Sequence, residues 1–417
     1  MKNKTVFRSA TQQDIEKILN VVEKAFRIEK GSDKWENMKN LILKEPENWR
    51  VLLENGEIIG AAHIGKSWLK IGKSKILKGD VGEVSIPPEY QGKGYGTKLM
   101  KDVVEWMKKE GYDISRLGGL VKFYSRFGYH KFPRRYVEFF FPKEIKGGRN
   151  IFPFSKFFLS NKKDFTHIRP FQKKDYSAYI NLYNQFNAER PGSPVLEIKK
   201  GNFPVKKDLL KVVYEENGKV LGYLFATKRK KKVSEFEPMM SFEIGGELKY
   251  RYVFEDLVLY ILRIAYKEGI KSVTTRLPFD PRLIEIIKEV KVPFKLVELY
   301  EAGASNMIQI ISLTSLFRHL LPELQYRLKN SLIEWNGTLE IDIGKEKIQL
   351  FIQKKRIKIT KNKKPDWKIK LDEPILLKMI LGMVSPSEIT FRKLSYQKIS
   401  LLQVLFPNLP TFSGAWG

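Results

Sequence analysis

Cysteine is absent from the 417 residues of the sequence. The chain therefore forms no internal disulfide bond and offers no thiolate metal ligand or cysteine nucleophile. The four histidines, His63, His130, His167 and His319, are scattered and lack the spacing of metal ligands. We therefore expect no structural zinc site and no metal cofactor.

Long apolar runs are missing as well. No segment approaches the ~18 consecutive apolar residues that a membrane-spanning helix needs. The polar residues 1–14 lack the apolar run of a signal peptide. We therefore expect no membrane span and a cytoplasmic location. With 42% hydrophobic residues the chain can bury a sizeable core, and a chain of this length should form roughly two to four domains.

Acidic residues are scarce relative to basic ones, with 47 Asp and Glu against 76 Lys and Arg and a formal charge of +29. Such a charge attracts polyanions, but lysine-rich, cysteine-free composition is also typical of proteins from hot environments. Basic clusters at residues 228–232, 354–356 and 361–364 lack the recurring aromatic residues of a single-strand binder. We therefore expect the basic residues to scatter over the surface, and nucleic acid not to be a partner.

An internal repeat occupies the first three hundred residues. It is carried by three pairs of segments in the same order, 7–20 with 168–181, 55–60 with 217–222, and 109–111 with 267–269. The first pair is typical of a strand followed by an amphipathic helix, the second of an Asn-Gly hairpin turn, and the third of a helix that ends at glycine. Three ordered matches predict two duplicated domains of roughly 150 residues.

Changes of composition indicate the domain boundaries. Residues 143–163 are rich in lysine and contain Gly147-Gly148 and Pro153, as an exposed linker does. From residue 313 a helical pattern is followed by segments that alternate with period two. We therefore predict an α+β fold in which domains 1–145 and 164–300 have mixed sheets and domain 304–417 has a helix packed on a small antiparallel sheet.

The loop Gln91-Gly92-Lys93-Gly94-Tyr95-Gly96 is the strongest chemical signal. It follows a strand at Val81–Ile86 and a Pro-Pro-Glu-Tyr segment, and it precedes a helix with apolar residues at helical spacing. The free N–H groups and the dipole of a helix N-terminus favour a bound phosphate, and glycine lets the ligand approach closely. Gln91 and Lys93 add side-chain donors. The preceding strand can offer the amides of Val84 and Ile86 to an extended ligand.

This arrangement resembles the pyrophosphate-binding motif of the GNAT superfamily of N-acetyltransferases. Residues 123–129, Phe-Tyr-Ser-Arg-Phe-Gly-Tyr, resemble its second signature, in which a tyrosine faces the thioester sulfur. Two such domains followed by a helix-and-sheet domain are similar to the Eis (enhanced intracellular survival) family, whose third domain resembles a sterol carrier. The second repeat has Lys249–Phe254 where the glycine loop should fall. We therefore expect the second repeat to be degenerate and not to bind acetyl-CoA.

The resemblance also implies roles for individual residues. The pantetheine arm of acetyl-CoA would contact Val84, Ser85 and Ile86. The pyrophosphate would contact Gly92, Lys93, Gly94, Tyr95, Gly96 and Thr97, with Gln91 beside them. Tyr124 would be the general acid that protonates the leaving thiolate, because a tyrosine hydroxyl with a pKa near 10 stays protonated at neutral pH.

The general base has two candidates. In the Eis family the carboxylate at the end of the chain reaches the active site, which here would be that of Gly417. The family usually ends on a bulkier residue, whereas here Trp416 is the penultimate one. Glu83, on the strand that leads to the loop, is the alternative base. His130 follows the second signature, but we expect it to pack or to face solvent.

The function implied by the resemblance is acetyl-CoA-dependent N-acetyl transfer to a primary amine by direct attack on the thioester. The acceptor stays open: an aminoglycoside-like amine, a lysine side chain or another small-molecule or peptide amine. The resemblance also implies a homo-oligomer, a hexamer in the family. The alternative function is a carrier of lipid or another apolar ligand with a vestigial acetyltransferase domain, against which the intact glycine loop argues.

Overall fold

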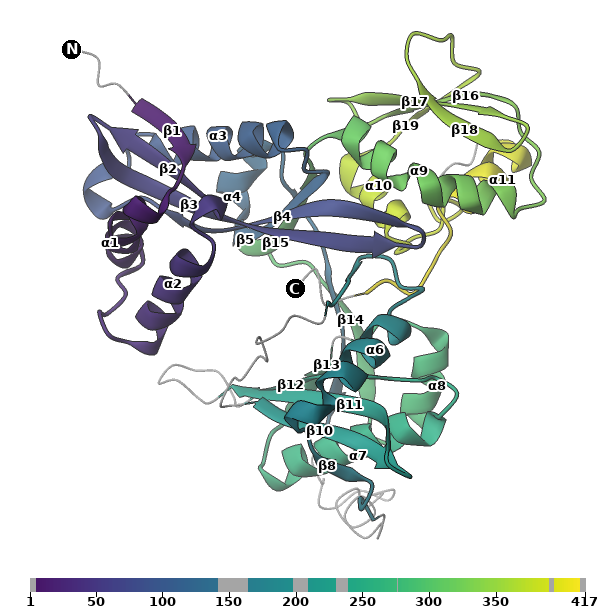
Figure 1. The fold of residues 1–417 in the computed structure, drawn as a ribbon. Helices are drawn as coiled ribbons and strands as arrows, with labels where there is room; N and C mark the ends of the chain where they lie inside the picture. The colour runs from purple at the N-terminus through teal and green to yellow at the C-terminus, as the bar shows by residue number, and fades with distance from the viewer. Residues whose placement is uncertain are drawn as a thin grey trace, which may run out of the picture. The chain divides into compact units, whose positions relative to one another are not determined.

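The computed structural model describes residues 5–141, 164–197, 209–229, 239–275, 277–389 and 394–412. The expected linker at 143–163 and Gly417 lie outside this range. The chain forms two compact units (Figure 1). The first combines the chain up to Phe132 with Tyr300–Ile380 and Val384–Pro407, and the second extends from Pro133 to Leu299 with two short later segments. None of the described helices is long and apolar enough to cross a membrane.

The first unit contains a mixed sheet with strand order β1-β2-β3-β4-β5-β15-β6. Of these neighbours only β4 and β5 run parallel. The strands are β1 (Thr5–Ser9), β2 (Trp49–Glu54), β3 (Glu57–Ile71), β4 (Ser74–Ser85), β5 (Ile114–Leu120), β6 (His130–Lys131) and β15 (Ala304–Ile310). The helices beside them are α1 (Ile15–Phe26), α2 (Asp33–Lys44), α3 (Tyr95–Lys109) and α4 (Val121–Tyr124).

Alternation along β3 places helices on both faces of this sheet. Ala61 packs in one apolar cluster with buried residues of α1 and α2. Its neighbour Ala62 packs in another cluster with buried residues of α3. Successive residues of a strand point to opposite faces. Helices α1 and α2 therefore cover one face and α3 covers the other.

The second unit contains a sheet with strand order β14-β7-β13-β12-β11-β10-β8. Its strands are β7 (Arg134–Phe140), β8 (Ile168–Pro170), β10 (Leu209–Glu216), β11 (Lys219–Arg229), β12 (Met239–Gly246), β13 (Ser272–Thr275) and β14 (Phe294–Leu299). The helices are α6 (Tyr176–Phe186), α7 (Arg251–Lys267) and α8 (Pro281–Lys288), and a short strand β9 spans Ser193–Pro194. As in the first sheet, one central pair, β12 with β13, runs parallel.

The repeat detected in the sequence corresponds to equivalent contacts at the start of each repeat. The Arg8 guanidinium donates to both oxygens of Asp14 at 2.6 and 2.8 Å. The Arg169 guanidinium donates to both oxygens of Asp175 at 2.7 and 2.9 Å. In each pair the guanidinium holds the pKa of the carboxyl below its usual range. The predicted pair of mixed-sheet domains in an α+β fold is confirmed.

Each of the two sheets contains one strand that the predicted boundaries assign to a different domain. Strand β7 lies before residue 145 but pairs with β13 and β14 in the second sheet. Strand β15, assigned from the sequence to the third domain, pairs with β5 and β6 in the first sheet. The boundaries at 145 and 304 therefore do not separate the sheets. Composition indicates where linkers lie in the sequence. It does not indicate which strands pair, because strands that are far apart in the sequence can lie side by side in one sheet.

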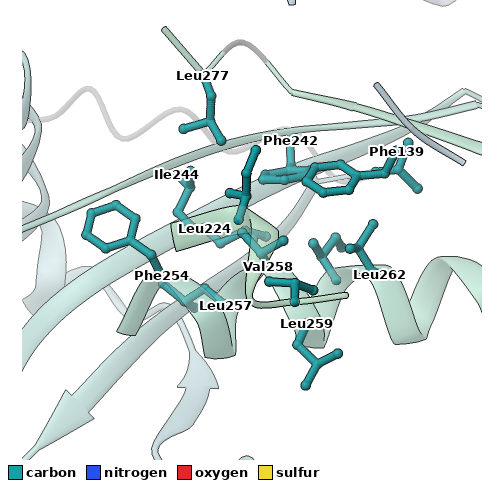
Figure 2. Packing of buried hydrophobic residues seen from close by; sticks show 14 of the residues in the cluster. Phe139, Leu224, Phe242, Ile244, Phe254, Leu257, Val258, Leu259, Leu262 and Leu277 are labelled. Carbon is teal, nitrogen blue, oxygen red and sulfur yellow. The ribbon is translucent and has the colours of Figure 1, made fainter. Parts of the chain in front are cut away.

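Strand β7 is held in the second sheet by its buried aromatic side chain. Phe139 is fully buried, and its ring stacks on that of Phe242 in β12 with centroids 6.4 Å apart. Figure 2 shows the two rings side by side above the apolar residues of α7, among them Val258 and Leu262. Burial of the Phe139 side chain stabilises the place of β7 in the second sheet by roughly 2 kcal/mol.

The last part of the first unit is a smaller helix-and-sheet layer. Its sheet has the order β18-β17-β16-β19, with strands β16 (Gly337–Asp342), β17 (Lys347–Gln353), β18 (Arg356–Thr360) and β19 (Trp367–Lys370). Helices α9 (Leu313–Lys329), α10 (Glu373–Ile380) and α11 (Tyr396–Leu405) lie on one side of it (Figure 1). The expected helix and sheet are present, but the sheet is not wholly antiparallel because β16 and β19 run parallel.

The tip of the β3–β4 hairpin is fastened to helix α9 through Glu323. The backbone N–H of Lys73 donates to the Glu323 carboxylate at 2.6 Å, and Arg327 Nε donates to its other oxygen at 2.6 Å. Gly72 has a φ of +56°, and a Cβ there would clash with the same carboxyl group. The contact therefore requires glycine both for its backbone angle and for its lack of a side chain.

We predict that Gly72→Ala destabilises the protein more than Gly56→Ala. Both residues have positive φ, but a Cβ at Gly56 meets nothing within 4 Å. Strain alone should cost about 1 kcal/mol at either position, and displacing Glu323 should add about 1–3 kcal/mol at Gly72. Thermal unfolding monitored by circular dichroism measures the difference. Equal losses in the two variants would show that the Glu323 contact contributes nothing.

Candidate functional site

The two parallel strands at the centre of the first sheet separate towards their carboxyl ends. Strands β4 and β5 pair from Lys78 with Ile114 to Val81 with Leu117. Beyond this point β5 continues along β15 as far as Leu120. A gap therefore opens between the ends of the two strands.

A bulge in β4 accompanies the separation. The register between β3 and β4 shifts after Ala61, which lies opposite Ser85, so that His63 lies opposite Gly82. Glu83 lies inside the shift and has a φ of +50°. Such a bulge bends a strand and re-aims its side chains. It turns Val84 at the end of β4, and Ile86 just after it, towards the gap.

A cavity of about 670 Å³ lies at the gap. Its size is that of a small-molecule site. The predicted residues that line it are Val84, Ile86, Gln91, Gly92, Gly94, Tyr95, Gly96, Thr97 and Tyr124. The structure thus brings together the glycine loop, the end of β4 and the tyrosine of the second signature.

Two predicted binding residues do not line the cavity. Ser85 is fully buried and donates its hydroxyl to the carbonyl oxygen of Glu83 at 2.8 Å. Lys93 places its ammonium group 5.6 Å from the centre of the Tyr90 ring. The Ser85 side chain therefore supports the bulge, and Lys93 lies at the outer side of the glycine loop.

The glycine loop has the geometry of an anion site. Gly92 and Gly94 have φ values of +75° and +81°, and Gly94 is the N-cap of α3. The Gln91 side-chain amide donates to the carbonyl oxygen of Ile86 at 2.8 Å and so ties the loop to the end of β4. The N–H groups in the first turn of a helix have no intrahelical partner. They are available to a phosphate that enters the cavity.

Tyr124 lies against a glycine on β5. A Cβ at Gly119 would clash with the Tyr124 ring, so only glycine allows this position. The Phe123 ring meets the Tyr124 ring edge-on with centroids 4.9 Å apart. Burial raises the pKa of Tyr124 above its ordinary value. Among the described residues, its hydroxyl forms no hydrogen bond.

The two candidate bases are placed differently. Glu83 is half-buried, and burial raises the pKa of its carboxyl while the charge of Lys34 lowers it. A carboxylate with a raised pKa is a better proton acceptor, but Glu83 is not among the described residues that line the cavity. The carboxylate of Gly417 lies outside the described residues. His130 is exposed, with Nε2 4.0 Å from Glu373.

Several lining residues were missed by the sequence analysis. Ala25 and Phe26 come from the end of α1, and no local pattern connects them with the glycine loop. Leu120 lines the cavity from the end of β5. Arg126 stacks its guanidinium 4.8 Å from the centre of the Phe123 ring and adds a positive charge. Its position inside the second signature was a signal that could have identified it.

The second unit has no glycine loop at the equivalent place. Strand β12 is joined to α7 by residues 247–250 alone, and Tyr250 is the N-cap. Val253 and Phe254 at the start of α7 are buried. A Cβ at Gly222 of β11 would lie 2.6 Å from Val253. Apolar side chains therefore pack against the sheet where the first unit has its loop.

Comparisons with known proteins identify the first repeat. Residues 6–132 match the family described as acetyltransferase (GNAT) domain. An uncharacterized N-acetyltransferase from Methanocaldococcus jannaschii is 26% identical over 140 residues, which cover 30% of this chain and 60% of that protein. The chain thus matches only 60% of the length of this curated relative. The first unit contains a GNAT acetyltransferase domain.

Solved structures match nearly the whole chain. A GCN5-related N-acetyltransferase from Anabaena variabilis has a TM-score of 0.65 at 15% identity, with 98% of each chain covered. The Eis1 protein from Mycobacterium abscessus has a TM-score of 0.59 at 16% identity, with 98% of this chain and 99% of that chain covered. At such identities the likeness shows the fold alone.

We predict that acetyl-CoA raises the melting temperature and that Gly94→Val removes this shift. A ligand that binds only the folded state at 100 times its Kd stabilises it by about 2.7 kcal/mol. Valine at a φ of +81° would distort the loop that holds the phosphates. The control is Gly218→Val, at a φ of +74° in a hairpin of the second unit with equally open surroundings. A shift retained in the Gly94 variant would contradict the assignment of the loop.

Proposed function

We propose that the GNAT domain transfers the acetyl group of acetyl-CoA to a primary amine. The observation that carries this proposal is the separation of β4 and β5, which opens one cavity to both the glycine loop and Tyr124. A ligand with phosphates at one end and a reactive thioester at the other fits these two features. The name of the relative from Methanocaldococcus jannaschii supports the same reaction class.

Binding of the cosubstrate would use mostly backbone groups. The end of β4 at Val84 and Ile86 can pair with the amides of the pantetheine arm as an added edge. The first turn of α3, from Tyr95 to Thr97, and the glycine loop would hold the pyrophosphate. Arg126 at the cavity adds a cation for a phosphate oxygen.

The chemistry needs one proton donor and one proton acceptor. Bound acetyl-CoA would supply the acetyl group as a thioester. The neutral amine attacks the carbonyl carbon, and the carbon–sulfur bond breaks. Tyr124 donates its hydroxyl proton to the sulfur and regains a proton from solvent. The proton released from the amine goes to Glu83 or to the carboxylate of Gly417, the two candidates for the base.

The rest of the chain would support this site. We infer that the second repeat is structural, because buried Val253 and Phe254 occupy its helix start. The fold likeness to the Eis1 structure supports an Eis-like order of domains with a sterol-carrier-like third domain. By the same resemblance we propose a homo-oligomer, a hexamer as in that family, and an aminoglycoside-like or lysine amine as the acceptor.

We predict that Tyr124→Phe lowers kcat roughly 10²-fold or more, which is typical of lost general acid catalysis. The affinity for acetyl-CoA should stay unchanged, because only one hydroxyl is removed. Tyr90→Phe is the matched control, since Tyr90 also lines the cavity and should keep its kcat. Steady-state kinetics with a panel of amines and calorimetry with acetyl-CoA separate the two effects. Full kcat in the Tyr124 variant would exclude it as the acid.

The same assay distinguishes the two bases. One alanine added after Gly417 moves the terminal carboxylate by up to ~3.5 Å, which is enough to misplace a proton acceptor. Glu83→Gln removes the other carboxylate with little change of shape. The variant that loses kcat identifies the base. If both stay fully active, the amine loses its proton to water and neither residue has this role.

A further inference from the structure

The small sheet of the first unit has one apolar face and one basic face. Along β17, Leu350 and Ile352 are buried on the side of the helices. Their neighbours Phe351 and Gln353 point to the other side and pair across the hairpin with Lys358 and Arg356. Arg356 and Lys358 are exposed. Positive side chains therefore share the outer face of this hairpin.

A hollow of about 450 Å³ lies on this face, lined by Phe351, Gln353, Lys354, Arg356 and Lys358. Among the residues that the structure describes, no carboxylate lines it. Within the described part of the chain, none of its three cations forms an ion pair.

Two other lysines of the same sheet are paired with carboxylates. Lys347 lies 3.1 Å from Asp342, and Lys368 lies 3.9 Å from Glu340. The three cations of the hollow differ from these two lysines, since no carboxylate of the described residues lines the hollow.

The tip of this hairpin holds its lysines at a conformational cost. Lys354 and Lys355 both have positive φ, +47° and +58°. The chain uses Asn-Gly at two other hairpin tips, at residues 55–56 and 217–218, where positive φ is favoured. Two consecutive non-glycine residues in this region cost roughly 1–2 kcal/mol each. Strain of this kind is typical of functional sites.

Side chains of neighbouring segments fix this tip. The backbone N–H of Lys354 donates to Asn336 Oδ1 at 2.9 Å. The Gln325 side chain donates to the carbonyl oxygen of Lys355 at 2.6 Å and accepts from the N–H of Ile357 at 2.8 Å. The position of the lysines is therefore preorganised rather than left to an open loop.

We propose that this hollow binds single-stranded nucleic acid. Lys354, Arg356 and Lys358 would contact successive phosphates, and the Phe351 ring with the Gln353 amide would contact a base, the combination found in single-strand sites. The ammonium group of Lys363 lies 3.5 Å from the centre of the Phe351 ring. It would leave this face of the ring when a base stacks there and would then add another cation for a phosphate. A concave surface with an aromatic floor fits a strand better than a flat bilayer.

This proposal departs from the expectation that the basic residues scatter over the surface and that nucleic acid is not a partner. The clusters at 354–356 and 361–364 were separate in the sequence. The pairing of β17 with β18 brings Arg356 and Lys358 beside Phe351. Lys363 reaches the same ring because its backbone N–H donates to Gln349 Oε1 at 3.1 Å. The aromatic residue that the sequence clusters lacked thus comes from the neighbouring strand.

The test is fluorescence anisotropy with labelled 15-nucleotide oligo(dT) and oligo(U) at several salt concentrations. Lys354→Asn with Lys355→Gly keeps a favoured turn and removes one cation of the hollow, because the Lys355 ammonium group donates to the carbonyl oxygen of Ser331 at 2.6 Å. Arg356→Gln with Lys358→Gln removes two cations of the hollow. We expect the first double variant to bind severalfold more weakly and the second about tenfold more weakly. The slope of log affinity against log salt should fall by ~0.7 for each phosphate that the variant no longer binds. Phe351→Leu should weaken binding severalfold with no change of slope.

The control is Lys173→Gln with Lys174→Gln, two exposed lysines of the second unit. Equal weakening by this control would overturn the proposal in favour of unspecific attraction to the net charge. Failure of the wild-type protein to bind either oligonucleotide would overturn it as well.

Flotation with phosphatidylserine vesicles tests whether the face binds a membrane instead. Vesicle binding that disappears in the hairpin variants but persists in Phe351→Leu, with no oligonucleotide binding, would assign the face to a membrane. Retained acetyl transfer in the hairpin variants verifies their fold.

Discussion

The separation of β4 from β5 after Val81 and Leu117 is the constraint on which the site depends. Paired parallel strands would leave no gap in the centre of the sheet. Two features keep them apart: the bulge at Glu83 in β4, and the pairing of β5 with β15 up to Leu120 and Ala304. Inside the bulge the Ser85 hydroxyl donates to the carbonyl oxygen of Glu83 at 2.8 Å, and β15 keeps β5 in the sheet beyond Leu117. The cavity is therefore a property of the whole sheet rather than of the glycine loop alone.

Strand β15 connects the gap between β4 and β5 with the duplicated fold. Strand β15 follows the second repeat in the sequence, yet it borders β5 at the site. Asn306 in β15 accepts from Arg116 Nε in β5 at 2.8 Å and anchors the two strands. A fragment that ends near residue 145 would lack this strand. A segment that follows the second repeat is thus needed to complete the first sheet.

The sequence predicted the features that depend on local chemistry. The glycine loop, the helix after it and Tyr124 are contiguous patterns, and the structure brings them to one cavity. The repeated Arg8–Asp14 pair was visible because equivalent residues recur in order. The placement of β7 and β15, the role of Gly119 under Tyr124 and the contribution of Phe26 depend on contacts between distant segments. No periodicity or spacing in a single sequence reports such contacts.

We propose that the first repeat holds the cosubstrate and the second does not. Isothermal titration calorimetry of the full chain with acetyl-CoA measures this directly. We expect one binding site per chain, since the second unit packs Val253 and Phe254 where the first has its loop. Two equivalent sites per chain would contradict it, as would one site that persists unchanged when Gly94 is replaced by valine.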